Sequence, residues 1–232
     1  MRLASLSILL SALTLGACSD EVEERPSAEQ PTADAAPQDI SVEGEERRIL
    51  AFGDSLFAGY NLADHQGYPE RLERALRKKG MNARVIDSGV SGDTSAAGRQ
   101  RLAFVLDQLE QKPDLVMLEL GGNDMLRGID PADTRANFEA MLAELQRRNI
   151  PVLLMGMRAP PNYGPDYQQR FDALYGELAD QYDTAIVPFW LESIYQNPSL
   201  FQADRIHPTP EGIDMLVADT LDEVEAALPA KN

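Results

Sequence analysis

The sequence is short of positive charge and of cysteine, and each shortage excludes a class of protein. Its 232 residues carry 21 Lys and Arg against 38 Asp and Glu, a formal net charge of −17 at pH 7. No basic stripe is available to neutralise the phosphates of nucleic acid or of anionic lipid headgroups. Cys18 is the only cysteine, so no disulfide forms within the chain. We therefore expect no nucleic-acid partner and no disulfide framework.

Ligands for a metal ion and a cradle for a nucleotide are also scarce. The two histidines, His65 and His207, lie far apart in the sequence, and no HExxH motif occurs. The loop after the first apolar segment of the folded part lacks the glycine-rich pattern that holds nucleotide phosphates. A metal site and a flavodoxin-like nucleotide site are both disfavoured, and we expect the protein to work without a cofactor.

The amino terminus is typical of an exported protein. One arginine precedes an apolar run over residues 3–15, which is shorter than the roughly 18 residues needed to span a bilayer. The four residues LGAC that end at Cys18 resemble a bacterial lipobox, which implies cleavage before Cys18 and lipidation of its sulfur. Acyl chains contribute about 0.8 kcal/mol per buried methylene, so a lipidated Cys18 would anchor the chain to a membrane. A plain secretory signal with an incidental cysteine is the alternative.

Three segments are expected along the chain: a lipoprotein signal peptide over residues 1–17, a lipidated and disordered tether over residues 18–46, and one folded domain over residues 47–232. The tether is rich in acids, proline and small residues, and it has too few large apolar side chains to offset the entropy cost of ordering. We expect an exported bacterial lipoprotein. An aspartate after the cysteine would suggest retention in the inner membrane, and Ser19 stands there instead, so we expect the periplasmic side of the outer membrane.

Apolar segments and helical patterns alternate through the folded part. Five short apolar segments predict strands at residues 49–52, 83–87, 115–120, 152–156 and 185–188. Helical spacing of apolar residues predicts helices at residues 69–79, 94–109, from Pro131 onward, 166–182 and 210–228. Strands that alternate with helices form parallel sheets covered on both faces. The prediction is an α/β fold, a three-layer α/β/α sandwich around a five-stranded parallel sheet.

Polar residues with catalytic potential follow these strands. Ser55 comes just after the first strand, Gly92 lies in the loop after the second, and Asn123 follows the third. The carboxyl ends of parallel strands share one edge of the sheet, where such folds bind their ligands. The segment DRIH before the last helix adds Asp204 and His207. A serine needs a base such as histidine to become a nucleophile, and a carboxylate three residues earlier can reach the histidine ring.

Four motifs together resemble, in order, the four blocks of the SGNH (GDSL) hydrolases: GDSL around Ser55, the glycine at Gly92, GGND around Asn123 and DxxH at residues 204–207. The strings FGDSLFAGYNL, LGGNDMLRG and IHPTPEG are similar to the bacterial arylesterase and thioesterase I/lysophospholipase L1 branch of this family. The resemblance covers about residues 48–228, which is essentially the whole folded part.

The resemblance implies a flavodoxin-like fold and a set of roles for these residues. Ser55 would be the nucleophile, His207 its base and Asp204 the carboxylate that orients the histidine. The backbone amides of Ser55 and Gly92 and the side-chain amide of Asn123 would form the oxyanion hole, which stabilises the negative charge of a tetrahedral intermediate.

The predicted reaction is hydrolysis of carboxylic esters, with thioesters as a second substrate class, through an acyl-serine intermediate in a monomeric enzyme. Small acyl esters and lysophospholipids are chemically sensible substrates for a lipid-anchored hydrolase. Four residues are expected to contact substrate: Phe57, Met125, Pro160 and Tyr163. Two alternatives stay open, a non-catalytic lipid-anchored protein that binds ligands on the same scaffold, and a carbohydrate O-deacetylase.

Overall fold

The computed structural model describes residues 40–230. The predicted signal peptide, the predicted lipidation site at Cys18 and most of the predicted tether lie outside these residues. Among the residues that are described, no helix is both long enough and apolar enough to cross a bilayer. What the structure shows is thus the predicted folded domain together with the few residues that precede it.

The last residues of the predicted tether lie against the domain. The side chain of Arg77 donates a 2.9 Å hydrogen bond to the carbonyl oxygen of Ile40, and the side chain of Asn82 donates one of 2.8 Å to the carbonyl oxygen of Gly44. These bonds satisfy backbone acceptors that a free tether would leave to water. Residues 40–46 were expected to be disordered, and these contacts instead attach them to the domain.

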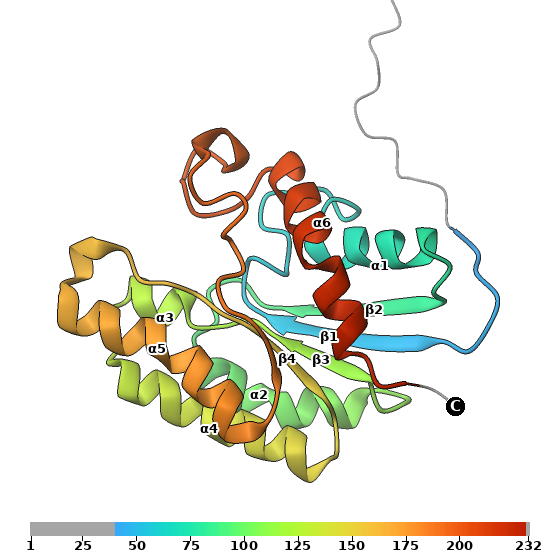
Figure 1. The fold of residues 1–232 in the computed structure, drawn as a ribbon, viewed down its shortest axis with the longest axis horizontal. Coiled ribbons are helices and arrows are strands. Elements are labelled where there is room, and N and C mark those ends of the chain that lie inside the picture. The colour runs from blue at the N-terminus through green and yellow to red at the C-terminus, as the bar shows by residue number, and fades with distance from the viewer. Residues whose placement is uncertain (1–39, 231–232) are drawn as a thin grey trace, which may run out of the picture. The chain divides into compact units, whose positions relative to one another are not determined.

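Five parallel strands form one sheet in the order β2-β1-β3-β4-β5 (Figure 1). The strands are β1 (Arg47–Gly53), β2 (Ala83–Gly89), β3 (Leu115–Leu118), β4 (Val152–Met155) and β5 (Ala185–Val187). All five predicted strands are present, which confirms the five-stranded parallel sheet. The register pairs Phe52 of β1 with Leu118 of β3, so these two strands end side by side.

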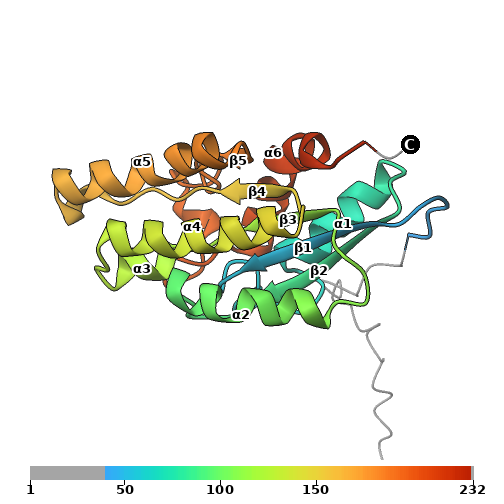
Figure 2. The same cartoon turned by 90° about the horizontal axis from the view of Figure 1, so that it is seen from below.

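Helices cover both faces of the sheet and complete three layers (Figure 1 and Figure 2). The helices are α1 (Tyr68–Lys78), α2 (Ser95–Gln108), α3 (Gly122–Leu126), α4 (Pro131–Arg147), α5 (Pro165–Tyr182) and α6 (Pro210–Ala227), with short 3₁₀ turns η1 (Pro161–Tyr163) and η2 (Pro198–Leu200). Helices α1 and α6 pack together on one face, and α2, α4 and α5 pack together on the other. The predicted three-layer sandwich is confirmed.

The central strands are apolar on both sides because helices cover both sides. Every residue of β3 is fully buried, and so are residues 49–52 of β1. Burying one such side chain contributes about 1.5–3 kcal/mol, so a continuous apolar run is favoured over an alternating one in a two-sided sheet. The first polar residues after β1 and β3 are therefore delivered together at the carboxyl edge of the sheet.

Candidate active site

Ser55 lies in a tight turn directly after β1. Gly53 ends the strand, and a Cβ atom at this position would come within 2.7 Å of the Glu119 carboxylate and of the Phe57 ring. Glycine is the residue that lets both side chains approach the backbone so closely. Residues 54–61 then form successive turns rather than a regular helix, so the hydroxyl of Ser55 stands at the end of a strand that is fixed by the core.

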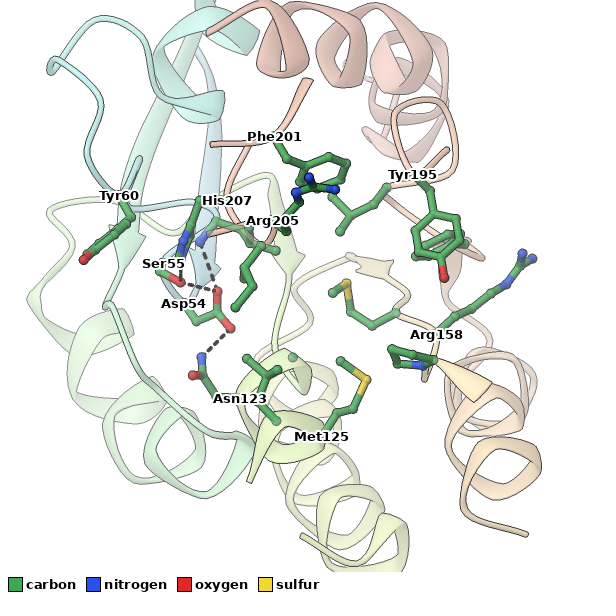
Figure 3. Close-up of a pocket in the computed structure, with 18 of the residues that line it drawn as sticks. Asp54, Ser55, Tyr60, Asn123, Met125, Arg158, Tyr195, Phe201, Arg205 and His207 are labelled. Atoms are coloured by element: carbon green, nitrogen blue, oxygen red, sulfur yellow. Dashed lines mark hydrogen bonds between the residues drawn. The ribbon is translucent and has the colours of Figure 1, made fainter. Parts of the chain in front are cut away.

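Three side chains form a continuous hydrogen-bonded series. Oγ of Ser55 lies 2.9 Å from Nε2 of His207 (Figure 3), and Nδ1 of His207 lies 2.7 Å from Oδ2 of Asp204. The serine and the histidine are 152 residues apart in the sequence. The structure thus brings the serine of the first motif together with the aspartate and the histidine of the last one.

Hydrogen bonds hold the Asp204 carboxylate in its ionised form. Oδ1 accepts the backbone amides of Ile206 at 2.9 Å and of His207 at 3.1 Å, while Oδ2 faces the ring. Partial burial by itself would raise the pKa of Asp204, but the bonds from the His207 ring and from the two amides outweigh it, and the pKa lies below its usual value. An ionised carboxylate accepts the proton on Nδ1, so Nε2 is the nitrogen that accepts from Ser55.

Asn123 reaches the site from the short helix α3, which the sequence pattern did not predict. The helix starts after Gly121, whose φ of 99° lies in the left-handed region that favours glycine. A side chain at this position would also collide with the Tyr175 hydroxyl. Nδ2 of Asn123 donates to Oδ2 of Asp54 at 2.9 Å (Figure 3). Because a side-chain amide carries two N–H groups, the second one stays available for a bound ligand.

Gly92 lies in the loop after β2 and lines the same cavity as Ser55 and Asn123. Its φ of 86° is in the left-handed region, which favours glycine. Its carbonyl oxygen accepts a 2.7 Å hydrogen bond from the Arg127 guanidinium. A Cβ atom on Gly92 would meet only that guanidinium, at 3.7 Å, so the backbone conformation rather than the space selects glycine here.

Ser55, Asn123 and His207 line a cavity of about 800 Å³ (Figure 3). This volume is in the range of small-molecule sites. Most of the wall is apolar, with methionine, leucine, phenylalanine and proline side chains, and the charged residues that reach it are Asp54, Arg158 and Arg205. Among residues 40–230, no group of three or more His, Cys, Asp or Glu is placed to hold a metal ion.

Phe57 does not contact this cavity, and its prediction as a substrate-binding residue was wrong. The side chain is fully buried and packs against the rings of Tyr68 and Trp190, with centroids 5.5 Å and 5.1 Å away. The turn after β1 presents Ser55 to the cavity and turns Phe57 into the core. Burial of a large aromatic ring stabilises that arrangement, and the ring braces the turn from behind.

Of the other three predicted substrate contacts, two line the cavity and one does not. Met125 and Pro160 line the cavity, as expected. Tyr163 is not among its lining residues, because the turn η1 directs its ring onto Tyr167, with centroids 5.3 Å apart. The structure therefore does not place Tyr163 at the cavity, although Arg158 and Pro160 of the same loop line it.

Two residues in the wall of the cavity, Tyr60 and Arg205, were not predicted as site residues because they belong to no recognised motif. The ring of Tyr60 packs on the ring of His207, with centroids 4.4 Å apart and planes inclined by 33°. Arg205 has a φ of 62°, which is uncommon for a residue with a side chain, and Figure 3 shows it between His207 and Phe201. Within the described part of the chain, no acceptor pairs with its guanidinium. The presence of an arginine between Asp204 and His207 was the sequence feature that could have indicated a cationic side chain at the site.

Glu119 was also missed, although it contacts the turn that carries Ser55. The sequence pattern included it in the third strand, yet its side chain is a fully buried carboxyl whose Oε2 accepts the backbone amide of Asp54 at 3.1 Å. Burial raises the pKa of Glu119 well above its usual value, and the charge of Asp54 raises it further. A single glutamate at the end of an otherwise apolar run was the signal for such a group.

Comparison with known proteins agrees with this geometry. The model of the GDSL-like Lipase/Acylhydrolase family matches residues 51–214. Esterase TesA of Pseudomonas aeruginosa is 44% identical over 160 residues, which cover 69% of this chain and 79% of that protein. Thioesterase 1/protease 1/lysophospholipase L1 of Escherichia coli is 39% identical over 160 residues, with 69% and 74% covered. The crystal structure of AlinE4, an SGNH-hydrolase family esterase, is 57% identical with a TM-score of 0.69, over 81% of this chain and 100% of that one.

A hydrogen-bonded serine, histidine and aspartate at the carboxyl edge of a parallel sheet is an arrangement typical of serine hydrolases. The chain belongs to the GDSL-like lipase/acylhydrolase family. The predicted family is thereby confirmed, and the protein is a serine hydrolase that acts on carboxylic esters.

Proposed function

We propose that Ser55 is the nucleophile of this hydrolase, that His207 is its general base, and that Asp204 orients the histidine. Oγ of Ser55 attacks the carbonyl carbon of the ester while its proton passes to Nε2 of His207. The imidazolium then gives this proton to the departing alcohol, and the acyl group stays on Ser55. A water molecule, deprotonated by His207, attacks the acyl carbon and releases the acid together with the free serine.

Three donors are positioned to stabilise the oxyanion that forms in both steps. They are the backbone amides of Ser55 and Gly92 and the second N–H of the Asn123 side chain. Support comes from the cavity itself, because all three residues line it. A preorganised donor of this kind typically contributes about 2.7–4 kcal/mol to the stability of the transition state.

The single observation that carries the proposal is the pair of contacts on the His207 ring, 2.9 Å to Ser55 and 2.7 Å to Asp204. A second support comes from AlinE4. Variants of that esterase in which one serine or one aspartate is replaced by alanine have been solved. The two replaced positions are as far apart in its sequence as Ser55 and Asp204 are here.

The wall of the cavity suggests an ester with an apolar chain and an anionic group. The wall is mostly apolar, and two guanidinium groups reach it although the chain as a whole is strongly acidic. Arg158 is paired with Glu192 at 2.8 Å, while Arg205 meets no acceptor among the residues described. An unpaired guanidinium favours a carboxylate or a phosphate on the ligand. Lysophospholipids and half-esters of dicarboxylic acids carry such groups, and thioesters remain within the proposed range.

The mechanism is tested by steady-state hydrolysis of p-nitrophenyl esters with two to sixteen acyl carbons, using a soluble form that begins after Cys18. We expect Ser55→Ala and His207→Ala each to lower kcat by about 10⁴- to 10⁶-fold, since such residues act as a unit. Ser91 also lines the cavity, but the hydrogen-bond partners of the His207 ring are Ser55 and Asp204, so Ser91→Ala should stay within about threefold of the wild type. Comparable losses in Ser91→Ala would overturn the assignment of the nucleophile.

The same assay separates the two alternatives. Turnover confined to acetyl esters would favour a carbohydrate O-deacetylase. A folded protein that hydrolyses no ester and is not labelled on Ser55 by an organophosphonate would favour a non-catalytic binding protein. Hydrolysis of medium acyl chains with Ser55-dependent labelling would support the proposed esterase.

The role of Arg205 is tested with two substrates of equal chain length, p-nitrophenyl hexanoate and the mono-p-nitrophenyl ester of adipic acid, which adds a terminal carboxylate. We expect Arg205→Gln to raise KM for the anionic ester by about three- to tenfold and to leave the neutral ester within about twofold, the scale of a partly exposed ion pair. Arg99→Gln on α2 is the matched control. An equal change for both esters would remove Arg205 from substrate recognition.

Export and anchoring complete the proposal. The lipobox at residues 15–18 supports lipidation of Cys18 and a place on the periplasmic side of the outer membrane, with the folded domain acting as a monomer. In cells fed with labelled palmitate, we expect the wild type to carry the label and to sediment with membranes. Cys18→Ser should be unlabelled and soluble. A soluble and unlabelled wild type would contradict the anchor and leave the esterase mechanism untouched.

A further inference from the structure

A pair of carboxyl groups lies buried directly behind the nucleophile, and the proposed mechanism uses neither of them. Asp54 follows β1, and Glu119 follows β3, the neighbouring strand. The amide of Glu119 donates to the carbonyl oxygen of Phe52 at 3.0 Å, and Oε2 of Glu119 accepts the amide of Asp54 at 3.1 Å. Glu119 is fully buried and Asp54 is 2% exposed. Burial of two carboxyl groups costs free energy, so we expect them to have a structural or functional role.

The two carboxyl groups accept from different numbers of donors. Burial raises the pKa of both, and the bonds from the Leu56 amide and the Asn123 side chain offset part of that rise at Asp54. Oε1 of Glu119, in contrast, meets no donor among the described residues. Two adjacent negative charges would repel each other strongly in a dry interior, so the pair keeps one proton. The donors around Asp54 put the charge on Asp54 and the proton on Glu119.

Asp54 connects two parts of the proposed machinery (Figure 3). Oδ1 accepts the amide of Leu56 at 3.0 Å, one residue beyond Ser55, and Oδ2 accepts Nδ2 of Asn123 at 2.9 Å. The first bond shapes the turn that carries Ser55. The second bond fixes the rotamer of Asn123 and determines that its nitrogen, and not its oxygen, lies on the side of the nucleophile. The carboxylate of Asp54 can do this only while its own backbone is held in place.

We infer that Glu119 is a positioning residue of the reaction: as a neutral carboxyl it holds Asp54, and Asp54 directs the side-chain amide of Asn123 toward the oxyanion. The inference rests on the proposed function, because it requires Asn123 to bind the oxyanion. That charge is present only in and near the transition state, so a misdirected donor lowers kcat and leaves KM almost unchanged. A purely structural Glu119 would lower the melting temperature and leave kcat of the folded enzyme intact.

Two substitutions of similar size separate these possibilities. Glu119→Gln is uncharged and still accepts the Asp54 amide, and its kcat should stay within about threefold of the wild type. Glu119→Met fills the space without an acceptor, and its kcat should fall by about 10- to 100-fold with KM within about threefold. Thr220→Val is the control, because it removes the buried 2.6 Å hydrogen bond to Tyr68 between α6 and α1. It should lower the melting temperature and not kcat.

The decisive measurement repeats Glu119→Met in an Asn123→Ala background. If Glu119 acts through Asn123, the second substitution costs less than about threefold there, because the donor that it directs is already gone. The full 10- to 100-fold loss in that background, or an equal loss in Glu119→Gln and Glu119→Met, would overturn the inference. If Glu119→Met does not fold, Asp54→Asn replaces it in the same cycle, with the same expected coupling. Failure of the proposed function gives a different result, namely turnover that survives in Ser55→Ala.

Discussion

The active site has two halves that are held in place by different forces. Ser55 and Asn123 follow buried strands, and the carboxyl behind them, Glu119, has no exposure to solvent. Asp204 and His207 belong to an irregular segment before α6, and the side chain of Asp204 is 36% exposed. The sheet-edge half is therefore positioned by the core, while the loop half is positioned by hydrogen bonds within a few residues. Ser55 and His207, whose side chains lie 2.9 Å apart, are thus supported mainly by different parts of the molecule.

The two halves also use their acids in opposite ways. Asp204 is ionised because three donors face it, and Glu119 is neutral because burial outweighs its single donor. In the proposed mechanism, the same chemical group thus acts as a charge in one half and as an uncharged acceptor in the other. This difference predicts opposite responses to replacement of an acid by its amide.

Among replacements of an acid by its amide, the largest effect is expected in the loop half, from Asp204→Asn. An amide cannot stabilise the imidazolium and favours the wrong tautomer of His207, so kcat should fall by about 10³- to 10⁴-fold while the melting temperature changes little. Glu119→Gln, the corresponding change in the sheet-edge half, should cost less than about threefold. Asp214→Asn, which removes an exposed partner of Arg71, is the control. Similar losses for both acid-to-amide changes would contradict the contrast between the halves.

A moderate effect is expected from the contacts that tie the loop half to the rest of the site. Nε2 of Gln202 donates to the carbonyl oxygens of Tyr60 at 2.8 Å and Pro208 at 3.0 Å. We expect Gln202→Ala to lower kcat by about three- to tenfold through a less fixed His207, the scale of two net hydrogen bonds. The melting temperature should remain close to that of Gln108→Ala, an exposed change on α2. Unchanged kcat would show that the loop positions its histidine without these bonds.

The smallest effect on activity is expected from Glu70, a partly buried acid on α1 outside the site. Burial raises the pKa of Glu70 from 4.5 to about 7 against an opposing backbone hydrogen bond, and the charges of Asp87, Glu73 and Asp64 raise it as well. The folded state therefore binds the proton more tightly than the unfolded state, and stability falls as pH rises from about 4.5 to about 7. Glu70→Gln should raise the melting temperature by a few degrees at pH 8, not at pH 4.5, with kcat unchanged. A change in kcat would tie this acid to the reaction.

Sequence alone predicted the parts of the site that are specified locally. Asp204 lies three residues before His207, so a single turn joins them, and Ser55 follows a strand that its apolar run defines. The helix α3 was not predicted because five residues are too few to show a helical period. Phe57 was assigned to the wrong side because spacing does not determine which way a side chain points in an irregular turn.

The contact between Glu119 and Asp54 could not be predicted from a local sequence pattern. Glu119 and Asp54 are 65 residues apart, and their contact exists only because β1 and β3 are neighbours in the sheet. Strand order follows from the packing of the whole domain and not from either segment. Long-range polar pairs of this kind are therefore the part of a functional site that is hardest to predict from a single sequence.

The packing of Phe57 gives the enzyme an optical reporter. Trp190 is the only tryptophan in the chain, and it lies fully buried with its ring edge-on to Phe57 and Tyr68, at 5.1 Å and 4.9 Å. Phe57 stands two residues beyond Ser55 in the same turn. Loosening of that turn would admit water to the indole and shift its fluorescence to longer wavelengths. Stopped-flow emission from one native fluorophore would thus follow the turn that carries Ser55 separately from product release.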